Sequence, residues 1–307
     1  MSDYSFGWLP DYPDMRDRSV TYMEPNDKPV IDPKEKVSVH RLWAKASAVS
    51  KKAALKNLPK KVLDLEKYFP PVDNQENINS CTAHAGTALV EYFENRSGGD
   101  YEKKSRLFLY KATRNLLKFE GDTGAFLRTT MKAMVLFGVP PEKYWAYEKE
   151  NMNAEPTPFC YSYAQNYQAI QYYRLDTFNY EKNVDIQKEH LLEEIKRNLV
   201  KGLPLMFGFT VYSCFNHCND GFIKYPTEKN KQLGGHAVVA VGYDDGIEIT
   251  GEDGKKIKGA IRIRNSWGTK WGDNGYGWLP YEYILNGLTK DWWSIIKNEW
   301  IDNKVFE

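Results

Sequence analysis

The chain has 307 residues, of which 42% are hydrophobic, 14% aromatic and 27% charged. This is enough to build one large domain, or two small ones, around a sizeable core. The 42 basic and 41 acidic residues leave a net charge of +1, which argues against nucleic acid or an acidic membrane surface as a partner.

The first 57 residues predict an extension rather than a folded domain. Residues 1–36 contain five prolines among many charges, which is typical of an extended arm. Residues 37–56 are basic with scattered apolar positions, so they allow a short amphipathic helix. The N-terminus lacks the basic and apolar regions of a signal peptide, and no stretch approaches the ~18 apolar residues of a membrane helix. We therefore expect a cytoplasmic protein.

Residues 58–307 predict the compact part of the chain, and its first half reads as helical. A helix is expected to begin at Cys81, because apolar residues recur after it with the helical period, Ser80 suits the N-cap and Gly98-Gly99 suits the stop. A thiol on the first helical turn is favoured as a thiolate by the helix dipole and by free backbone N–H groups. A lone cysteine at this position is more often simply buried, so the interpretation depends on partners elsewhere. Further helices are expected at 106–117, 127–138 and 185–200.

The second half of the compact region changes to a period of two, which predicts strands. Turns are expected at Asp244-Asp245-Gly246 and at Asp253-Gly254, the second of them in a hairpin. Helices followed by strands indicate an α+β fold of two packed lobes, about 74–170 and 171–290, with a cleft between them and a C-terminal tail at 291–307. The expected strands are Leu205–Tyr212, His236–Tyr243, Gly259–Ile263 and Tyr276–Leu279.

Two of the five histidines could serve as a base for Cys81. His84 lies only three residues after Cys81 on the same helix, where nothing nearby would orient it, so we expect it to be structural or solvent-facing. His236 begins an apolar β-run directly after Gly234-Gly235, and glycines let a substrate backbone approach the imidazole closely. A core histidine at a strand end is the alternative for His236.

Asn265 and Gln75 could complete the chemistry of such a pair. The side-chain carbonyl of Asn265 can accept the second N–H of an imidazole and fix its tautomer, and Trp267 can shield that bond from water. The alternative is that this Trp- and Gly-rich stretch is only a packed hairpin loop. Gln75, six residues before Cys81, can place its amide N–H beside the Cys81 backbone N–H, and two converging donors make an oxyanion hole.

The remaining cysteines do not predict a metal site. Cys214 and Cys218 flank His217 in a Cys-Phe-Asn-His-Cys run, which could be half of a zinc site. Because no second pair of ligands stands at suitable spacing, we expect a local disulfide or two free thiols instead.

Three motifs in the order Cys, His, Asn resemble those of the papain-like cysteine peptidases, the C1 family that includes the cathepsins. The run Asn265-Ser266-Trp267-Gly268-x-x-Trp271-Gly272-x-x-Gly275-Tyr276 is similar to the family's Asn motif. Gly235-His236-Ala237-Val238 is similar to its His motif, and Gln75 with Ser80-Cys81 has the spacing of its oxyanion glutamine and nucleophile. The resemblance covers about Leu58 to the C-terminus.

This resemblance implies a papain-like two-lobe fold, with a helical lobe and an antiparallel, barrel-like β lobe. It implies a thiolate–imidazolium pair of Cys81 and His236, oriented by Asn265 and assisted at the oxyanion by Gln75, that hydrolyses peptide or protein substrates through a thioester. It requires no cofactor and no metal. It also assigns a set of substrate-binding residues and predicts a bulky apolar or aromatic residue second before the cleaved bond. That set is Gly124, Ala125, Phe126, Gly235 and Ala237.

The sequence also departs from the family pattern. Ile78 stands where a disulfide-bonded cysteine is usual, Asn79 and Thr82 replace a glycine and an aromatic residue, and the usual glycine pair is Gly124-Ala125. Missing disulfides indicate a reducing compartment or a prokaryote-like branch. A catalytically idle binding protein on this fold, or an acyl or amide transferase using the same thioester, remains an alternative.

Apolar residues in the extension predict that it packs against the compact region. Phe6, Trp8, Leu9, Tyr12 and Met15 cluster among prolines, and each would forfeit ~1.5–3 kcal/mol if left in water. We expect part of residues 1–57 to cover the cleft and restrain activity, as in a zymogen. The alternative is a strap along the outside of the lobes that only adds stability.

Overall fold

The computed structural model describes residues 5–14, 16–17, 58–98, 101–179, 184–185, 188–218 and 220–298. The expected helix at 37–56 lies outside these residues, as do the side chain of His217 and most of the extension.

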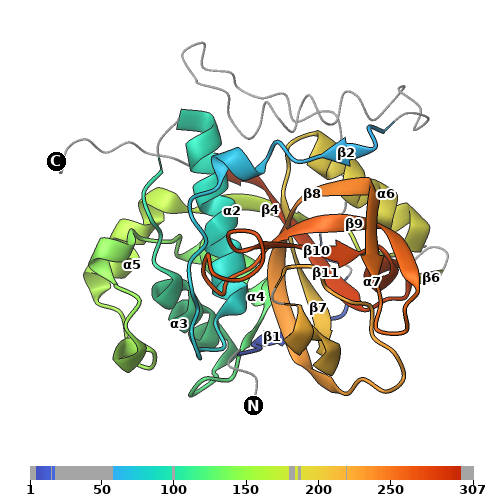
Figure 1. Ribbon diagram of the computed structural model, residues 1–307. Helices are drawn as coiled ribbons and strands as arrows, with labels where there is room; N and C mark the ends of the chain where they lie inside the picture. Colours follow the sequence, from blue (N-terminus) through green and yellow to red (C-terminus); the bar gives the residue numbers. More distant parts are fainter. Residues whose placement is uncertain are drawn as a thin grey trace, which may run out of the picture.

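Helices α2, α3 and α5 lie on one side of the described fold, and the sheet lies on the other together with α6 and α7 (Figure 1). Ser105 begins α3 by accepting a hydrogen bond from the Phe108 backbone N–H, and Thr157 begins α5 in the same way through the Cys160 N–H. These N-caps explain why both helices start where they do. The helices are α2 (Cys81–Gly98), α3 (Arg106–Leu117), α4 (Leu127–Leu136), α5 (Pro158–Ala164), α6 (Lys188–Val200) and α7 (Glu282–Leu285), with 3₁₀ turns at Glu66–Tyr68, Glu142–Tyr144, Lys149–Asn151, Gln165–Tyr167 and Ser213–His217.

The main sheet has seven strands in the order β10-β9-β8-β7-β11-β4, with β2 paired to β8. All of these pairings are antiparallel, so helices precede an antiparallel sheet and the predicted α+β class is confirmed. The strands are β2 (Lys61–Val62), β4 (Ala169–Arg174), β7 (Leu205–Tyr212), β8 (Gln232–Thr250), β9 (Lys256–Arg264), β10 (Tyr276–Pro280) and β11 (Thr289–Asn298), and β5 (Phe178–Asn179) pairs with β6 (Val184–Asp185) apart from them.

Two expectations about the second half were wrong. The turn at Asp244–Gly246 is absorbed into β8, which passes through it with a register shift between Asp244 and Glu248 and then makes the expected hairpin at Asp253-Gly254. The tail expected from residue 291 begins inside β11, between β7 and β4. Trp292, Trp293 and Ile295 are completely buried there, and this burial of large apolar groups makes the segment part of the core.

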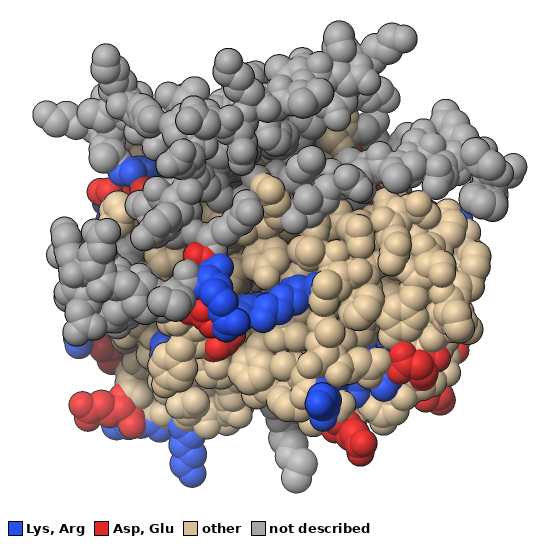
Figure 2. Space-filling model, turned by 180° about the vertical axis from the view of Figure 1, so that it is seen from behind, with Lys and Arg blue, Asp and Glu red and all other residues tan. Residues whose placement is uncertain are grey.

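One hydrophobic core joins the helical side to the sheet. The central helix α2 packs against β8 and β7 and contributes buried residues such as Leu89, Tyr92 and Phe93. No helix among the described residues is both long and apolar enough to span a membrane. On the face seen in Figure 2, acidic and basic side chains are scattered without a large patch of one sign, in keeping with the net charge.

Part of the N-terminal extension lies between the two sides. Strand β1 (Trp8–Leu9) pairs in parallel with β3 (Ala125–Phe126), just before α4 (Figure 1). Below, residues 5–9 are called the cleft segment, and residues 10–14 with 16–17 are called the anchor segment.

Candidate active site

Cys81 is the first residue of α2, as predicted, and its side chain is completely buried. Burial raises the pKa of the Cys81 thiol to about 11, although the backbone N–H groups of Ala237, Gly7 and Thr82 lie against the sulfur and lower it. Two of these donors come from outside α2, one from β8 and one from the cleft segment. The sulfur therefore lies where helix, sheet and extension meet.

His236 lies in β8, opposite Phe209 of β7, and is completely buried. Its Nε2 is 2.8 Å from Oδ1 of Asn265, so Nε2 carries the proton and donates it to the amide oxygen. In the described structure Nδ1 has no hydrogen-bond partner. Burial lowers the pKa of His236 to about 4, and the bond to Asn265 partly opposes this shift. The imidazole is thus neutral, with an acceptor nitrogen available for a proton.

Trp267 covers the bond between His236 and Asn265. Its ring stacks on the imidazole with centroids 4.7 Å apart and planes 24° apart. Asn265 Oδ1 also accepts the Ser266 backbone N–H at 2.8 Å, which holds the amide in this orientation. The shielding role of Trp267 stays a prediction, and this stacking is the contact on which it rests.

Gln75 spans the two sides of the site with its side-chain amide. Its Oε1 accepts from Ser266 Oγ at 2.5 Å, and its Nε2 donates to the Ile78 carbonyl at 2.9 Å. The same Nε2 lies 3.3 Å from the Ser5 carbonyl oxygen. The amide orientation is fixed by these contacts, so a donor faces the cleft where the sequence predicted one.

The cleft segment covers Cys81, His236, Trp267 and Gln75. The Gly7 N–H lies at the Cys81 sulfur, and the Phe6 ring meets the rings of His236 and Trp267 edge-on, with centroids 6.2 and 6.1 Å away. Together with the Ser5 carbonyl at Gln75, these contacts occupy the space that a substrate would need.

The five residues predicted to bind substrate all lie along the same segment. Ala125 donates its backbone N–H to the Gly7 carbonyl at 2.8 Å, and Phe126 pairs with Leu9. A Cβ added to either glycine of the set would overlap the segment. At Gly124 it would meet the Gly7 carbonyl, and at Gly235 it would lie 2.6 Å from the Trp8 ring. Ala237 is the fifth, through its N–H at Cys81.

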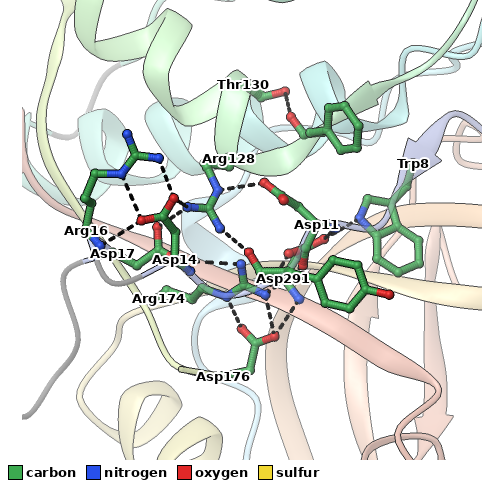
Figure 3. A network of polar contacts seen from close by, with 12 residues as sticks. Trp8, Asp11, Asp14, Arg16, Asp17, Arg128, Thr130, Arg174, Asp176 and Asp291 are labelled. Carbon is green, nitrogen blue, oxygen red and sulfur yellow. Dashed lines mark hydrogen bonds and ion pairs between the residues drawn. The ribbon is translucent and has the colours of Figure 1, made fainter. Parts of the chain in front are cut away.

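The anchor segment is held beside the cleft by two buried arginines (Figure 3). Arg128 of α4 pairs with Asp11 Oδ2 at 2.6 Å and with Asp17 Oδ1 at 2.5 Å, and also donates to the Tyr12 carbonyl. Arg174 of β4 donates to the Asp11 carbonyl at 3.1 Å. The side chains of Arg128 and Arg174 are 9% and 1% exposed. The segment supplies the described carboxylate partners of Arg128, whereas Arg174 is also paired with Asp176 and Asp291.

The other candidate residues take no part in the contacts described above, although His84 lines a small cavity together with Ala237, Asn265 and Ser266. His84 is buried and its Nδ1 lies 3.3 Å from Ser80 Oγ, so the solvent-facing alternative is wrong and the structural alternative stays a prediction. Burial lowers the pKa of His84 to about 3, because α2 turns this side chain inward toward Tyr147. Cys214 and Cys218 are free, buried thiols, which excludes the disulfide alternative.

Several contacting residues escaped the sequence interpretation. Ser266 orients Gln75. The position of Ser266 directly after Asn265 was the sequence signal that could have identified this residue. Asp291 accepts the Trp8 indole N–H at 3.0 Å, and Arg128 and Arg174 bind the anchor segment. Trp8 and Asp291 are 283 positions apart, so no local pattern could have paired them.

The chain is similar to known proteins over most of its length. Residues 58–287 match a family model described as papain family cysteine protease. The chain is 30% identical over 299 residues to an uncharacterized peptidase C1-like protein, L477, of Acanthamoeba polyphaga mimivirus, covering 95% of this chain and 86% of the relative. It is also 30% identical to the crystal structure of xylellain, a cysteine protease from Xylella fastidiosa, covering 96% and 97% of the two chains at a TM-score of 0.72. Digestive procathepsin L 3 of Tenebrio molitor, at 18% identity, covers 78% of this chain and 71% of its own at a TM-score of 0.58, and shares the fold.

Proposed function

The chain belongs to the papain family of cysteine proteases, and we propose that it hydrolyses peptide bonds with Cys81 as nucleophile, His236 as general base and acid, and Asn265 as the residue that orients the imidazole. The observation that carries the proposal is that the two ring nitrogens of His236 differ in their partners. Nε2 is held by Asn265 at 2.8 Å, while Nδ1 has no other partner in the described structure. This leaves Nδ1 to exchange a proton with a thiol.

In the proposed reaction His236 Nδ1 takes the proton of Cys81, and the sulfur attacks the carbonyl carbon of the peptide bond. The oxyanion is stabilised by Gln75 Nε2 and the Cys81 backbone N–H. His236 then protonates the leaving amine as the C–N bond breaks and a thioester forms. Water gives a proton back to His236 while its oxygen attacks the thioester, which releases the carboxylic acid and restores the thiol.

We further propose that the cleft segment restrains this activity. With the segment in place, burial holds the pKa of Cys81 at about 11 and that of His236 at about 4, so both groups are neutral near pH 7. Removing the segment would admit solvent, and solvation favours the charged forms of both groups. The thiolate–imidazolium pair is therefore a prediction for the uncovered protein.

The expected preference for a bulky apolar or aromatic residue second before the cleaved bond also stays a proposal. It is supported by Trp8, which fills the space beside Gly235 and is only 5% exposed.

The proposal is tested with a peptide library and the Cys81→Ala variant of the full chain. Cleavage by the wild type and none by the variant, with unchanged circular dichroism, is expected. Turnover by Cys81→Ala at the wild-type rate would reject Cys81 as nucleophile. Asn265→Ala is expected to lower the rate and leave measurable activity, because Asn265 orients and does not react.

Two further measurements separate the alternatives. A thiol-directed epoxide should add its mass at Cys81 in an enzyme and not in an idle binding protein. Adding amines to the peptide reaction and analysing the products distinguishes a transferase, which would form new amides, from a hydrolase.

A further inference from the structure

The Trp8 side chain lies in a slot whose walls are formed by two strands and whose end is formed by a third. Gly208 of β7 and Gly235 of β8 lie against the indole ring, and a Cβ at either position would overlap it. Glycine inside a strand forgoes side-chain packing, and it commonly marks a place where another group approaches closely. The two glycines therefore shape a space for a flat ring.

The end of the slot is a buried carboxylate. Asp291 has no exposed surface, and its Oδ2 accepts the Trp8 indole N–H at 3.0 Å and the Asp11 backbone N–H at 2.9 Å (Figure 3). Asp291 stands in a register shift of β11, between Lys290 and Trp293, with φ at 59°. Bulges and left-handed residues re-aim side chains at functional sites, and here the irregularity directs a carboxylate at the ring.

This slot adjoins the proposed catalytic residues. Gly235 immediately precedes His236, and Gly7, which immediately precedes Trp8, reaches Cys81 with its N–H and Ala125 with its carbonyl. A substrate can reach Cys81 only after the cleft segment leaves, and Trp8, whose indole N–H is bonded to Asp291 Oδ2, leaves with it. Asp291 Oδ2 has then lost a hydrogen bond that a donor on the substrate can restore. A substrate side chain that covers this carboxylate without donating to it leaves a buried group unsatisfied, which is costly.

We propose that Asp291 selects a substrate side chain that is flat and carries a neutral N–H donor, namely tryptophan, at the second residue before the cleaved bond. This inference rests on the proposed function, because it assigns a substrate side chain to the same cleft. Sites built to hydrogen-bond a substrate N–H discriminate strongly against analogues that lack it, so phenylalanine would fill the slot without replacing the hydrogen bond that the indole makes to Asp291 Oδ2.

Charge distinguishes tryptophan from lysine and arginine in this slot. Asp291 Oδ1 already lies 2.9 Å from Arg174, which is also bonded to Asp176. Once Asp11 and Asp17 have left, Arg128 and Arg174 balance Asp176 and Asp291. A cationic substrate side chain would leave this buried group with a net positive charge, whereas an indole adds a donor and no charge.

The test uses the full chain with Trp8→Ala, which removes the protein's own ring from the slot. Peptides that differ only in Trp, Phe, Leu or Arg at the second residue before the cleaved bond are compared by kcat/KM. We expect Trp to exceed Phe by about tenfold or more in kcat/KM.

Adding Asp291→Asn should reduce this ratio of kcat/KM values to about threefold or less, because a neutral acceptor replaces a charged one. Asn also tolerates a positive φ. Adding Asp244→Asn, whose carboxylate pairs with Lys61, should leave the ratio unchanged.

A second measurement needs no catalysis. Indole and 1-methylindole are titrated into the Trp8→Ala chain, and binding is followed by the rise in melting temperature. Indole is expected to bind about tenfold more tightly, because only indole has the N–H donor. Equal binding, equal kcat/KM for Trp and Phe peptides, or a preference for Arg would overturn the inference. If no peptide is cleaved by any variant, the proposed function is wrong, and the indole comparison still decides the role of Asp291.

Discussion

The two parts of the N-terminal extension bind the protein by different means. The cleft segment contacts Cys81, His236 and Gln75 through backbone groups and aromatic rings, and only one of its described contacts, Trp8 to Asp291, involves a charged side chain. The anchor segment is joined to Arg128 and Arg174 mainly by carboxylates. The comparison teaches that blocking the chemistry and holding the segment in place are assigned to different residues, so each can be disrupted without the other.

Removing both segments should have the largest effect. A thiol with a pKa of about 11 is about 100-fold less ionised at pH 7 than one with an ordinary pKa near 9. Deleting residues 1–17 should therefore speed iodoacetamide modification of Cys81 at pH 7 by about 100-fold or more, as followed by mass spectrometry. In the full chain the rate should keep rising with pH toward about 11. Equal rates of Cys81 modification in the full and the shortened chain at pH 7 would contradict the view that the extension covers the thiol.

Disrupting the cleft segment alone should have the next largest effect. A Cβ at Gly7 would overlap the Asn79 carbonyl, and overpacking of this kind costs about 1–3 kcal/mol. Gly7→Ala should therefore raise the rate on a small peptide about 30-fold. Gly246→Ala is the matched control, because a Cβ there meets nothing closer than 3.3 Å. A Gly7→Ala enzyme as slow as the wild type would show that the segment does not block the chemistry.

Disrupting the anchor segment alone should have a smaller effect, because the cleft segment keeps its own contacts. Arg128→Gln removes the ion pairs to Asp11 and Asp17 and should raise the peptidase rate about tenfold. Arg262→Gln serves as control, since Arg262 is similarly buried and is paired with Glu66 and Asp273, and not with a described residue of the extension. A similar rise in both variants would indicate general loosening of the fold.

Added salt should have the smallest effect. Exposed charge pairs are screened by salt, whereas buried pairs are screened much less, and the side chains of Arg128 and Asp17 are only 9% and 6% exposed. Raising the ionic strength from 0.05 to 1 M should change the rate of the full chain by less than about threefold. A tenfold activation by salt would indicate that the ion pairs of the anchor segment lie on the surface, and would contradict their burial.

The sequence predicted those features of the fold that depend on local patterns. Apolar periodicity and the residues that begin and end helices predicted α2, α3 and β7 at the positions where they occur, because such patterns act over a few residues. It did not predict β11 in place of a tail, since the buried state of Trp292 and Trp293 depends on β7 and β4 on either side.

The same distinction applies to the site. Gln75, Cys81, His236 and Asn265 were found from spacing, and the structure brings them to one cleft. The thiolate expected for Cys81 at the start of a helix is not favoured in this structure, because burial raises the pKa of the thiol more than the backbone donors around the sulfur lower it. One of these donors, the Gly7 N–H, comes from 74 positions away along the chain, and no pattern around Cys81 predicts that contact.

The covalent link between the extension and the compact region gives the cleft segment the character of a tethered ligand. Residues 5–17 remain joined to the body at residue 58 through residues 18–57, so their return to the cleft is an intramolecular event with an effective concentration that does not change on dilution. One cut within residues 18–57 would turn the same contacts into a two-molecule equilibrium. Activation by proteolysis would then become stronger as the protein is diluted, although no contact in the cleft had changed.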